Sequence, residues 1–121
     1  MEYIDIVLKF IIAFGIFNVW LIRYNKPTTW RGAKANNMVD EFKAYGLPKT
    51  AVPIIGGLKI LAAIGLIVSY WIPQIELYSA LIMAVLMIGA ISMHVKINDE
   101  LKKSLPAFLM LLLSLAVMLI D

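Results

Sequence analysis

Four long runs of apolar residues, separated by polar segments, dominate the pattern of this sequence. They cover residues 3–22, 53–71, 75–95 and 105–120. A helix rises ~1.5 Å per residue, so runs of this length reach most or all of the ~30 Å hydrocarbon core of a bilayer. The pattern therefore predicts four transmembrane helices. Because consecutive spans cross the membrane in opposite directions, they are expected to form an antiparallel four-helix bundle.

The second run contains one charged residue, Lys59, in an otherwise apolar helix. A lysine near the centre of a span costs ~2.5–3.5 kcal/mol, so the direction of this side chain matters. At about 100° per residue, Lys59 shares a face with the small residues Gly56, Ala62 and Ala63. Small residues allow neighbouring helices to approach closely. We therefore expect Lys59 to point into the bundle and not toward lipid.

The polar residues of the first run have simpler interpretations. Asp5 and Lys9 stand four positions apart, a spacing that permits an exposed ion pair near the membrane surface. Asn18 shares a face with Ile11, Phe14 and Gly15, and we expect that face to contact another helix.

The connection over residues 23–52 is long for a helical bundle and contains its own helical pattern. Within residues 33–45, apolar side chains recur at helical spacing as Met38, Phe42 and Tyr45. This pattern predicts a short amphipathic helix, lying at the membrane interface between the first and second spans.

The composition supports a membrane protein and excludes several other classes. Of the 121 residues, 62% are hydrophobic and only 16% are charged, whereas soluble domains are ~45–50% apolar. The net charge of +3 does not indicate nucleic-acid binding, because the cations flank the apolar runs and form no continuous basic stripe. The absence of cysteine excludes disulfides and thiolate metal sites. We expect one domain over residues 1–121.

The lysines and arginines also predict an orientation. Residues 23–52 contain six of them and residues 96–104 contain three more, so nine of the eleven lie in these two connections. Cytoplasmic loops carry an excess of such residues. We therefore expect both connections to be cytoplasmic and both termini to be outside, in a multi-pass protein of the cell (inner) membrane.

This topology places Asn18, Lys59 and His94 near the same side of the membrane. If their faces meet, the three side chains would line a polar pocket open toward the cytoplasm, suited to a lipid headgroup, a quinone carbonyl or another polar ligand. Structural roles stay open for each: an interhelical hydrogen bond for Asn18, a stem that reaches toward the interface for Lys59, and an interfacial position for His94. The sequence predicts no catalytic constellation, no metal site and no intrinsic cofactor.

Spans two to four also carry a recognisable motif set. The second span has the form GxxKxxxAxGL, and the third ends in a histidine followed by a lysine and an aspartate. The matching residues are Gly56, Lys59, Ala63, Gly65, Leu66, Ala90, His94, Lys96, Asp99, Lys102 and Pro106. With these motifs the segment 42–120 resembles the DoxX family, in its DoxX-like branch. The resemblance implies a four-helix integral membrane protein; some relatives are small subunits of terminal quinol oxidases or thiosulfate:quinone oxidoreductases.

Two hypotheses for function follow. The first is a non-catalytic accessory subunit of a respiratory or other membrane complex. The second is a protein that binds a small molecule, a lipid or a quinone, or a small transporter, using Asn18, Lys59 and His94. The expected partners are the lipid bilayer and either other membrane-protein subunits or further copies of this chain, but not nucleic acid.

Overall fold

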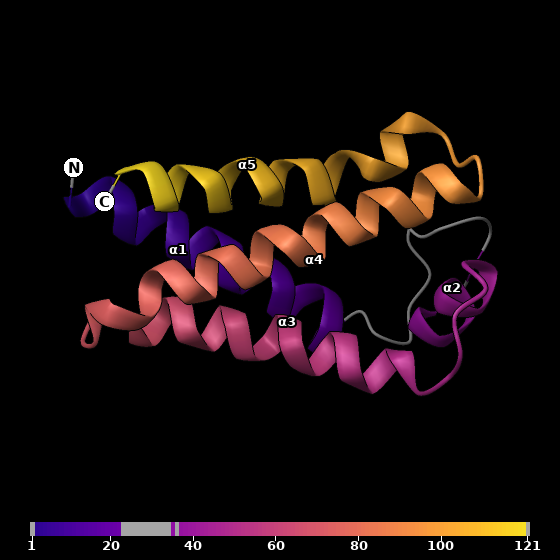
Figure 1. Ribbon diagram of the computed structural model, residues 1–121, viewed down its shortest axis with the longest axis horizontal. Coiled ribbons are helices and arrows are strands. Elements are labelled where there is room, and N and C mark those ends of the chain that lie inside the picture. The colour runs from indigo at the N-terminus through magenta and orange to yellow at the C-terminus, as the bar shows by residue number, and fades with distance from the viewer. Residues whose placement is uncertain (1, 23–34, 36, 121) are drawn as a thin grey trace.

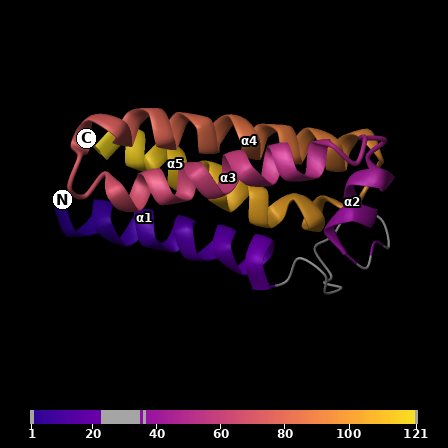
Figure 2. The same ribbon diagram turned by 90° about the horizontal axis from the view of Figure 1, so that it is seen from below.

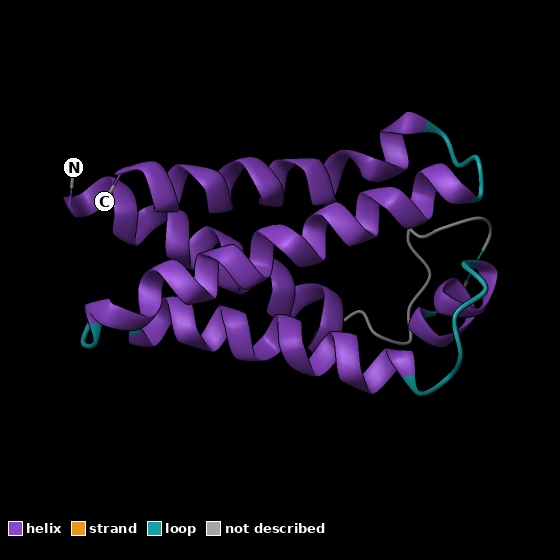
Figure 3. Ribbon diagram, in the orientation of Figure 1, coloured by secondary structure: helices purple, strands orange, loops and turns teal. Residues whose placement is uncertain are grey.

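The computed structural model describes residues 2–22, 35 and 37–120, and the regular structure within these residues is helical (Figure 3). Four helices are long and apolar enough to cross a membrane: Tyr3–Ile22, Ala51–Val68, Pro73–Lys96 and Leu101–Ile120. The prediction of an all-α membrane protein with four transmembrane helices is therefore confirmed.

The elements follow the predicted runs to within a few residues. The second span is helical over residues 51–68 and not 53–71, because residues 69–71 form a turn. In chain order the elements are α1 (Glu2–Phe17), the π-helical turn η1 (Asn18–Ile22), α2 (Met38–Ala44), α3 (Ala51–Val68), the 3₁₀ turn η2 (Pro73–Ile75), α4 (Glu76–Lys96), the 3₁₀ turn η3 (Leu101–Ser104) and α5 (Leu105–Ile120).

The long helices form an antiparallel bundle in which α1 and α4 lie diagonally opposite each other. Both α1 and α4 pack against α3 and α5, which separate them (Figures 1 and 2). The two chain termini and the α3–α4 turn lie at one end, called the terminal end below (Figure 1). Helix α2 and the α4–α5 connection lie at the other end, called the loop end.

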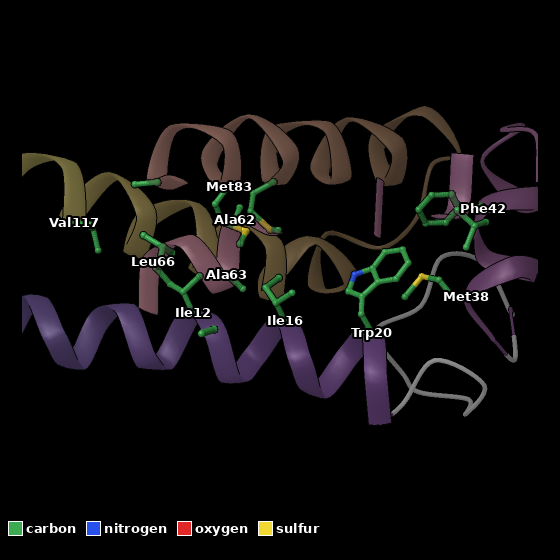
Figure 4. Packing of buried hydrophobic residues seen from close by; sticks show 14 of the residues in the cluster. Ile12, Ile16, Trp20, Met38, Phe42, Ala62, Ala63, Leu66, Met83 and Val117 are labelled. Atoms are coloured by element: carbon green, nitrogen blue, oxygen red, sulfur yellow. The ribbon is translucent and has the colours of Figure 1, made fainter. Parts of the chain in front are cut away.

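The centre of the bundle is a buried apolar layer to which each long helix contributes. Ile12 of α1, Leu66 of α3, Met83 of α4 and Val117 of α5 are all completely buried (Figure 4). Lipid tails are as apolar as these side chains, so close van der Waals packing, and not removal from water, holds the layer together. The outward faces are apolar as well; Leu61, for example, is 65% exposed in the isolated chain and suits lipid.

Small residues on α3 bring its neighbours close, as predicted from the face that they share. Ala62 and Ala63 are buried in the core. A Cβ atom at Gly56 would lie 2.6 Å from Cε3 of Trp20, and one at Gly65 would collide with Oγ of Ser79. These two glycines therefore set the distance from α3 to the α1–η1 segment and to α4.

Helix α2 is shorter than the predicted helix over residues 33–45. It begins at Met38 because Asn37 has an extended backbone (φ −158°, ψ 175°) and acts as the N-cap. The Asn37 side-chain oxygen accepts a hydrogen bond of 2.8 Å from the backbone N–H of Asp40, satisfying a donor that a helix start leaves open. Positions 33, 34 and 36 lie outside the described residues.

The apolar side predicted for this helix is confirmed. Met38, Phe42 and Tyr45 are each at most 5% exposed. Met38 and Phe42 lie beside Trp20 (Figure 4), with the Phe42 ring edge-on to the indole at a centroid distance of 5.8 Å. The contact with Trp20 fastens α2 to the loop end of the bundle.

Candidate ligand-binding cavity

A cavity of ≈ 780 Å³ occupies the loop-end half of the bundle. Described residues of η1 and of all five α-helices contribute to its walls. Most of the lining is apolar, with Ile16, Met87 and Ala107 as examples. Ligand sites are commonly concave, mostly apolar and ~300–1,000 Å³ in volume, with a few polar groups that orient the ligand. The cavity fits this description in both size and lining.

Small side chains leave this space open. The central layer is filled by large aliphatic residues, whereas the cavity walls include Gly89 and Ala90. A Cβ atom built at Gly89 would have no neighbouring atom within 4 Å. The π-helical turn η1 contributes further, because its wider winding changes the directions of Asn18 and Trp20 relative to a continuous α-helix.

The three residues singled out from the sequence, Asn18, Lys59 and His94, all line this cavity. Lys59 is half-buried and points into the bundle, as predicted, with Nζ 5.3 Å from the centre of the Trp20 ring. A cation over an indole face is stabilised by the negative face of the ring. Binding of a ligand by these residues stays a prediction.

The expected helix contact of the Asn18 face is seen only at Gly15, where a Cβ atom would collide with the Met110 side chain of α5. Asn18 is exposed at the border of the cavity, and Ile11 and Phe14 are 47% and 61% exposed. The reason is the change of winding at residue 18: the α-helical face of Ile11 and Phe14 points outward, and the π-helical turn carries Asn18 to the cavity edge instead.

His94 is buried and holds two side-chain contacts at once. Its Nδ1 lies 2.8 Å from Oδ2 of Asp99, and its Nε2 lies 3.3 Å from the hydroxyl oxygen of Tyr45. The Tyr45 hydroxyl also donates a hydrogen bond of 2.7 Å to Oε2 of Glu41. Tyr45 and Glu41 line the cavity as well. The sequence did not predict this network, because Tyr45 is 49 positions from His94.

A turn after α4 brings Asp99 back to His94. Asn98 has a positive φ of 57°, a conformation that asparagine tolerates better than most residues. The backbone N–H of Asp99 then donates to the carbonyl of His94 at 3.0 Å. From the same helix end, Lys96 donates to the backbone carbonyl of Tyr45 at 3.1 Å, which holds the tyrosine against the histidine.

The terminal end holds a second polar cluster, and here the sequence prediction was wrong. Asp5 and Lys9 are buried, not exposed, with relative exposures of 9% and 5%. Lys9 Nζ lies 2.8 Å from Asp5 Oδ2 and 3.0 Å from Glu76 Oε1. The pair is buried because Glu76, at the start of α4, completes it from the diagonal helix. The spacing of residues along α1 alone could not predict the contact with Glu76.

Comparison with known proteins identifies one family. A family model described as "DoxX-like family" matches residues 28–117, which include most of the cavity-lining residues. Searches of curated proteins and of solved structures gave no significant match.

Proposed function

Since the chain belongs to the DoxX-like family of membrane proteins, we propose that it binds a small amphiphilic molecule, a lipid or a quinone, in the loop-end cavity. The observation that carries this proposal is the cavity itself, ≈ 780 Å³ in volume and mostly apolar, with polar side chains at its edge. A purely structural four-helix bundle would be expected to fill such a space, because protein interiors are close-packed.

The distribution of side chains supports a ligand with an apolar body and a hydrogen-bond-accepting head. Ile16, Met87 and Met110 provide apolar walls, and the two methionines are flexible. Lys59, Lys103 and the amide of Asn18 provide hydrogen-bond donors. A carbonyl or phosphate oxygen would accept from these groups while the apolar part of the molecule lies against the methionines.

A pair of glycines offers a matched test. Gly89 lines the cavity and Gly57 does not, and a Cβ at either position would meet no atom within 4 Å. Gly89→Phe adds a ring at the exposed edge of the cavity, where it should obstruct binding, whereas Gly57→Phe adds the same ring at a position outside the cavity lining. We expect native mass spectrometry of the gently extracted protein to show a co-purifying lipid or quinone with the wild type and Gly57→Phe, and at least tenfold less with Gly89→Phe.

A second variant pair tests the polar end of the same site. Lys59→Met should weaken retention, whereas Lys102→Met, at an exposed position of the same end outside the cavity lining, should not. Added decylubiquinone and phosphatidylglycerol serve as separate probes, so that a quinone site and a lipid site give different results. Equal retention of both probes by wild type and Gly89→Phe would remove the case for the cavity as a binding site.

The role of a non-catalytic accessory subunit in a respiratory or other membrane complex stays a prediction. It does not compete with ligand binding, because a subunit of such a complex can hold a lipid or a quinone. The cavity favours a binding role as the first to be tested.

We also propose that the loop end faces the cytoplasm and the terminal end faces outside. The positive residues support this orientation: Lys96, Lys102 and Lys103 lie at the loop end, whereas the α3–α4 turn over residues 69–75 carries no lysine or arginine. In a bacterial cell this would be the inner membrane. The bound molecule would then have its polar head near the cytoplasmic face.

A further inference from the structure

Lys9 and Lys59 both lie more than one helical turn inside their spans, and they differ in what they contact. Lys9 is buried, with Nζ 2.8 Å from Asp5 Oδ2 and 3.0 Å from Glu76 Oε1. Lys59 forms no hydrogen bond and no salt bridge with the residues that the structure describes; its contact is the indole face of Trp20, with Nζ 5.3 Å from the ring centre. The bundle therefore pairs Lys9 with its own carboxylates but provides no such partner for Lys59.

The ammonium group of Lys59 needs hydrogen-bond acceptors that the described part of the chain does not supply. A lysine ammonium has three N–H donors. Charged groups inside a membrane pair with one another, pair with backbone carbonyls or face a cavity. An indole face attracts the positive charge but does not replace oxygen acceptors. Because Lys59 lines a cavity with mostly apolar walls, the missing acceptors have to belong to the occupant of that cavity.

The ammonium group lies in the loop-end part of the cavity. Helical side chains tilt toward the N-terminus of their own helix, and α3 begins at the loop end (Figure 1). The stem of Lys59 therefore extends toward that end. The Trp20 ring indicates the same level, because it packs against Gly56, three positions earlier in α3, where a Cβ atom would lie 2.6 Å from Cε3 of the indole.

An apolar part of the cavity lies between this ammonium group and the central layer of the bundle. Ile16 and Met87 line it, each one helical turn on the loop-end side of a residue of the central layer, Ile12 or Met83. Figure 4 shows Ile12, Ile16 and Trp20 in this order along the α1–η1 segment. The cavity is therefore suited to a molecule with a charged head toward the loop end and a hydrocarbon body toward the centre.

We propose that Lys59 binds the phosphate group of a phospholipid, whose apolar part enters the cavity. This inference rests on the ligand binding proposed above and narrows the ligand to one chemical class. The two non-bridging oxygens of a phosphodiester accept several hydrogen bonds and carry the negative charge that the ammonium lacks. A quinone carbonyl would accept a hydrogen bond but leave the positive charge unpaired in apolar surroundings. The amide of Asn18, at the cavity border, can donate to a further head-group oxygen.

Three matched probes separate the phosphate from the hydrocarbon. Dioctanoyl phosphatidylglycerol has both, dioctanoylglycerol has the same acyl chains without phosphate, and glycerol 3-phosphate has the phosphate without acyl chains. Each is added to delipidated protein in a neutral detergent at neutral pH, and the bound probe is measured by native mass spectrometry. We expect the wild type to retain roughly tenfold more dioctanoyl phosphatidylglycerol than either of the other probes.

Variants then assign the preference to Lys59. Lys59→Met should lower the retention of dioctanoyl phosphatidylglycerol to that of dioctanoylglycerol, and Lys59→Arg, which keeps a cationic donor, should preserve the preference. Lys102→Met removes an exposed lysine of the same end that does not line the cavity, and should behave as the wild type. Unchanged retention of dioctanoylglycerol by Lys59→Met shows that the cavity is intact in that variant.

The outcomes distinguish this inference from the binding role on which it rests. Equal retention of dioctanoyl phosphatidylglycerol and dioctanoylglycerol by the wild type, with loss of both in Gly89→Phe, would overturn the role of the phosphate and leave the cavity as a binding site. A preference for phosphate that persists in Lys59→Met would overturn the role of Lys59. Equal retention of glycerol 3-phosphate would show a site for free phosphate and overturn the lipid. Retention of every probe unchanged in Gly89→Phe would overturn the binding role and this inference together.

Discussion

Replacement of Gly56 by alanine tests the packing that positions Trp20 at the cavity wall. A Cβ atom at this site would lie 2.6 Å from Cε3 of the indole and closer still to Cζ3. Optimal carbon–carbon contacts are ~3.5–4.0 Å, so the ring or the helix has to move by about 1 Å. The ring has little freedom to do so, because it is only 6% exposed and is packed against Phe42.

Two opposing effects determine the size of the change. Overpacking of a well-filled site costs ~1–3 kcal/mol, whereas glycine to alanine within a helix gains ~0.5–1 kcal/mol. The neighbouring variant Gly57→Ala should have the stability gain of alanine within a helix but no collision, since a Cβ there meets no atom within 4 Å. We therefore expect Gly56→Ala to be ~1–3 kcal/mol less stable than Gly57→Ala.

The comparison can be made by unfolding both variants in mixed micelles with increasing sodium dodecyl sulfate, followed by far-ultraviolet circular dichroism. Gly57→Ala should unfold at the same or a higher detergent fraction than the wild type. Gly56→Ala should unfold at a lower fraction than Gly57→Ala. Coincident unfolding curves for the two alanine variants would refute the conclusion that Gly56 is required for the approach of Trp20.

Two further predictions concern the other close helix contact and the orientation. Gly65→Ala should destabilise the protein by ~1–3 kcal/mol through the collision with Ser79, and adding Ser79→Ala should recover part of that loss in the same unfolding assay; additive losses would argue against the contact. Because the chain has no cysteine, Gln74→Cys and Lys102→Cys can each be labelled from outside intact cells with a membrane-impermeant maleimide. Only Gln74→Cys should react, and the opposite result would reverse the proposed orientation.

Much of the fold could be predicted because a bilayer imposes its own length and polarity on the chain. A span needs enough consecutive apolar residues to cross the hydrocarbon core, and every backbone polar group within it must be satisfied internally. Four such runs therefore predict four helices without any knowledge of their contacts. The packed face of α3 was also predictable, since a strip of small residues marks it; Ala62 and Ala63 are buried.

The polar clusters were harder to predict, because periodicity describes one helix at a time. It placed Asp5 and Lys9 next to each other but could not show that Glu76, at the start of α4, would form an ion pair with Lys9. It drew attention to His94 but not to Tyr45, whose hydroxyl approaches from α2.

The sequence by itself determined that this chain resides in a membrane, where its four helices begin and end to within a few residues, and which face of α3 is packed. Only the tertiary structure decided that α1 lies diagonally opposite α4 and that a π-helical turn directs Asn18 and Trp20 to the cavity. The physical reason is that hydrophobic length and helical period are properties of a single segment. The rotation of one helix against another depends on which side chains from distant segments fit together.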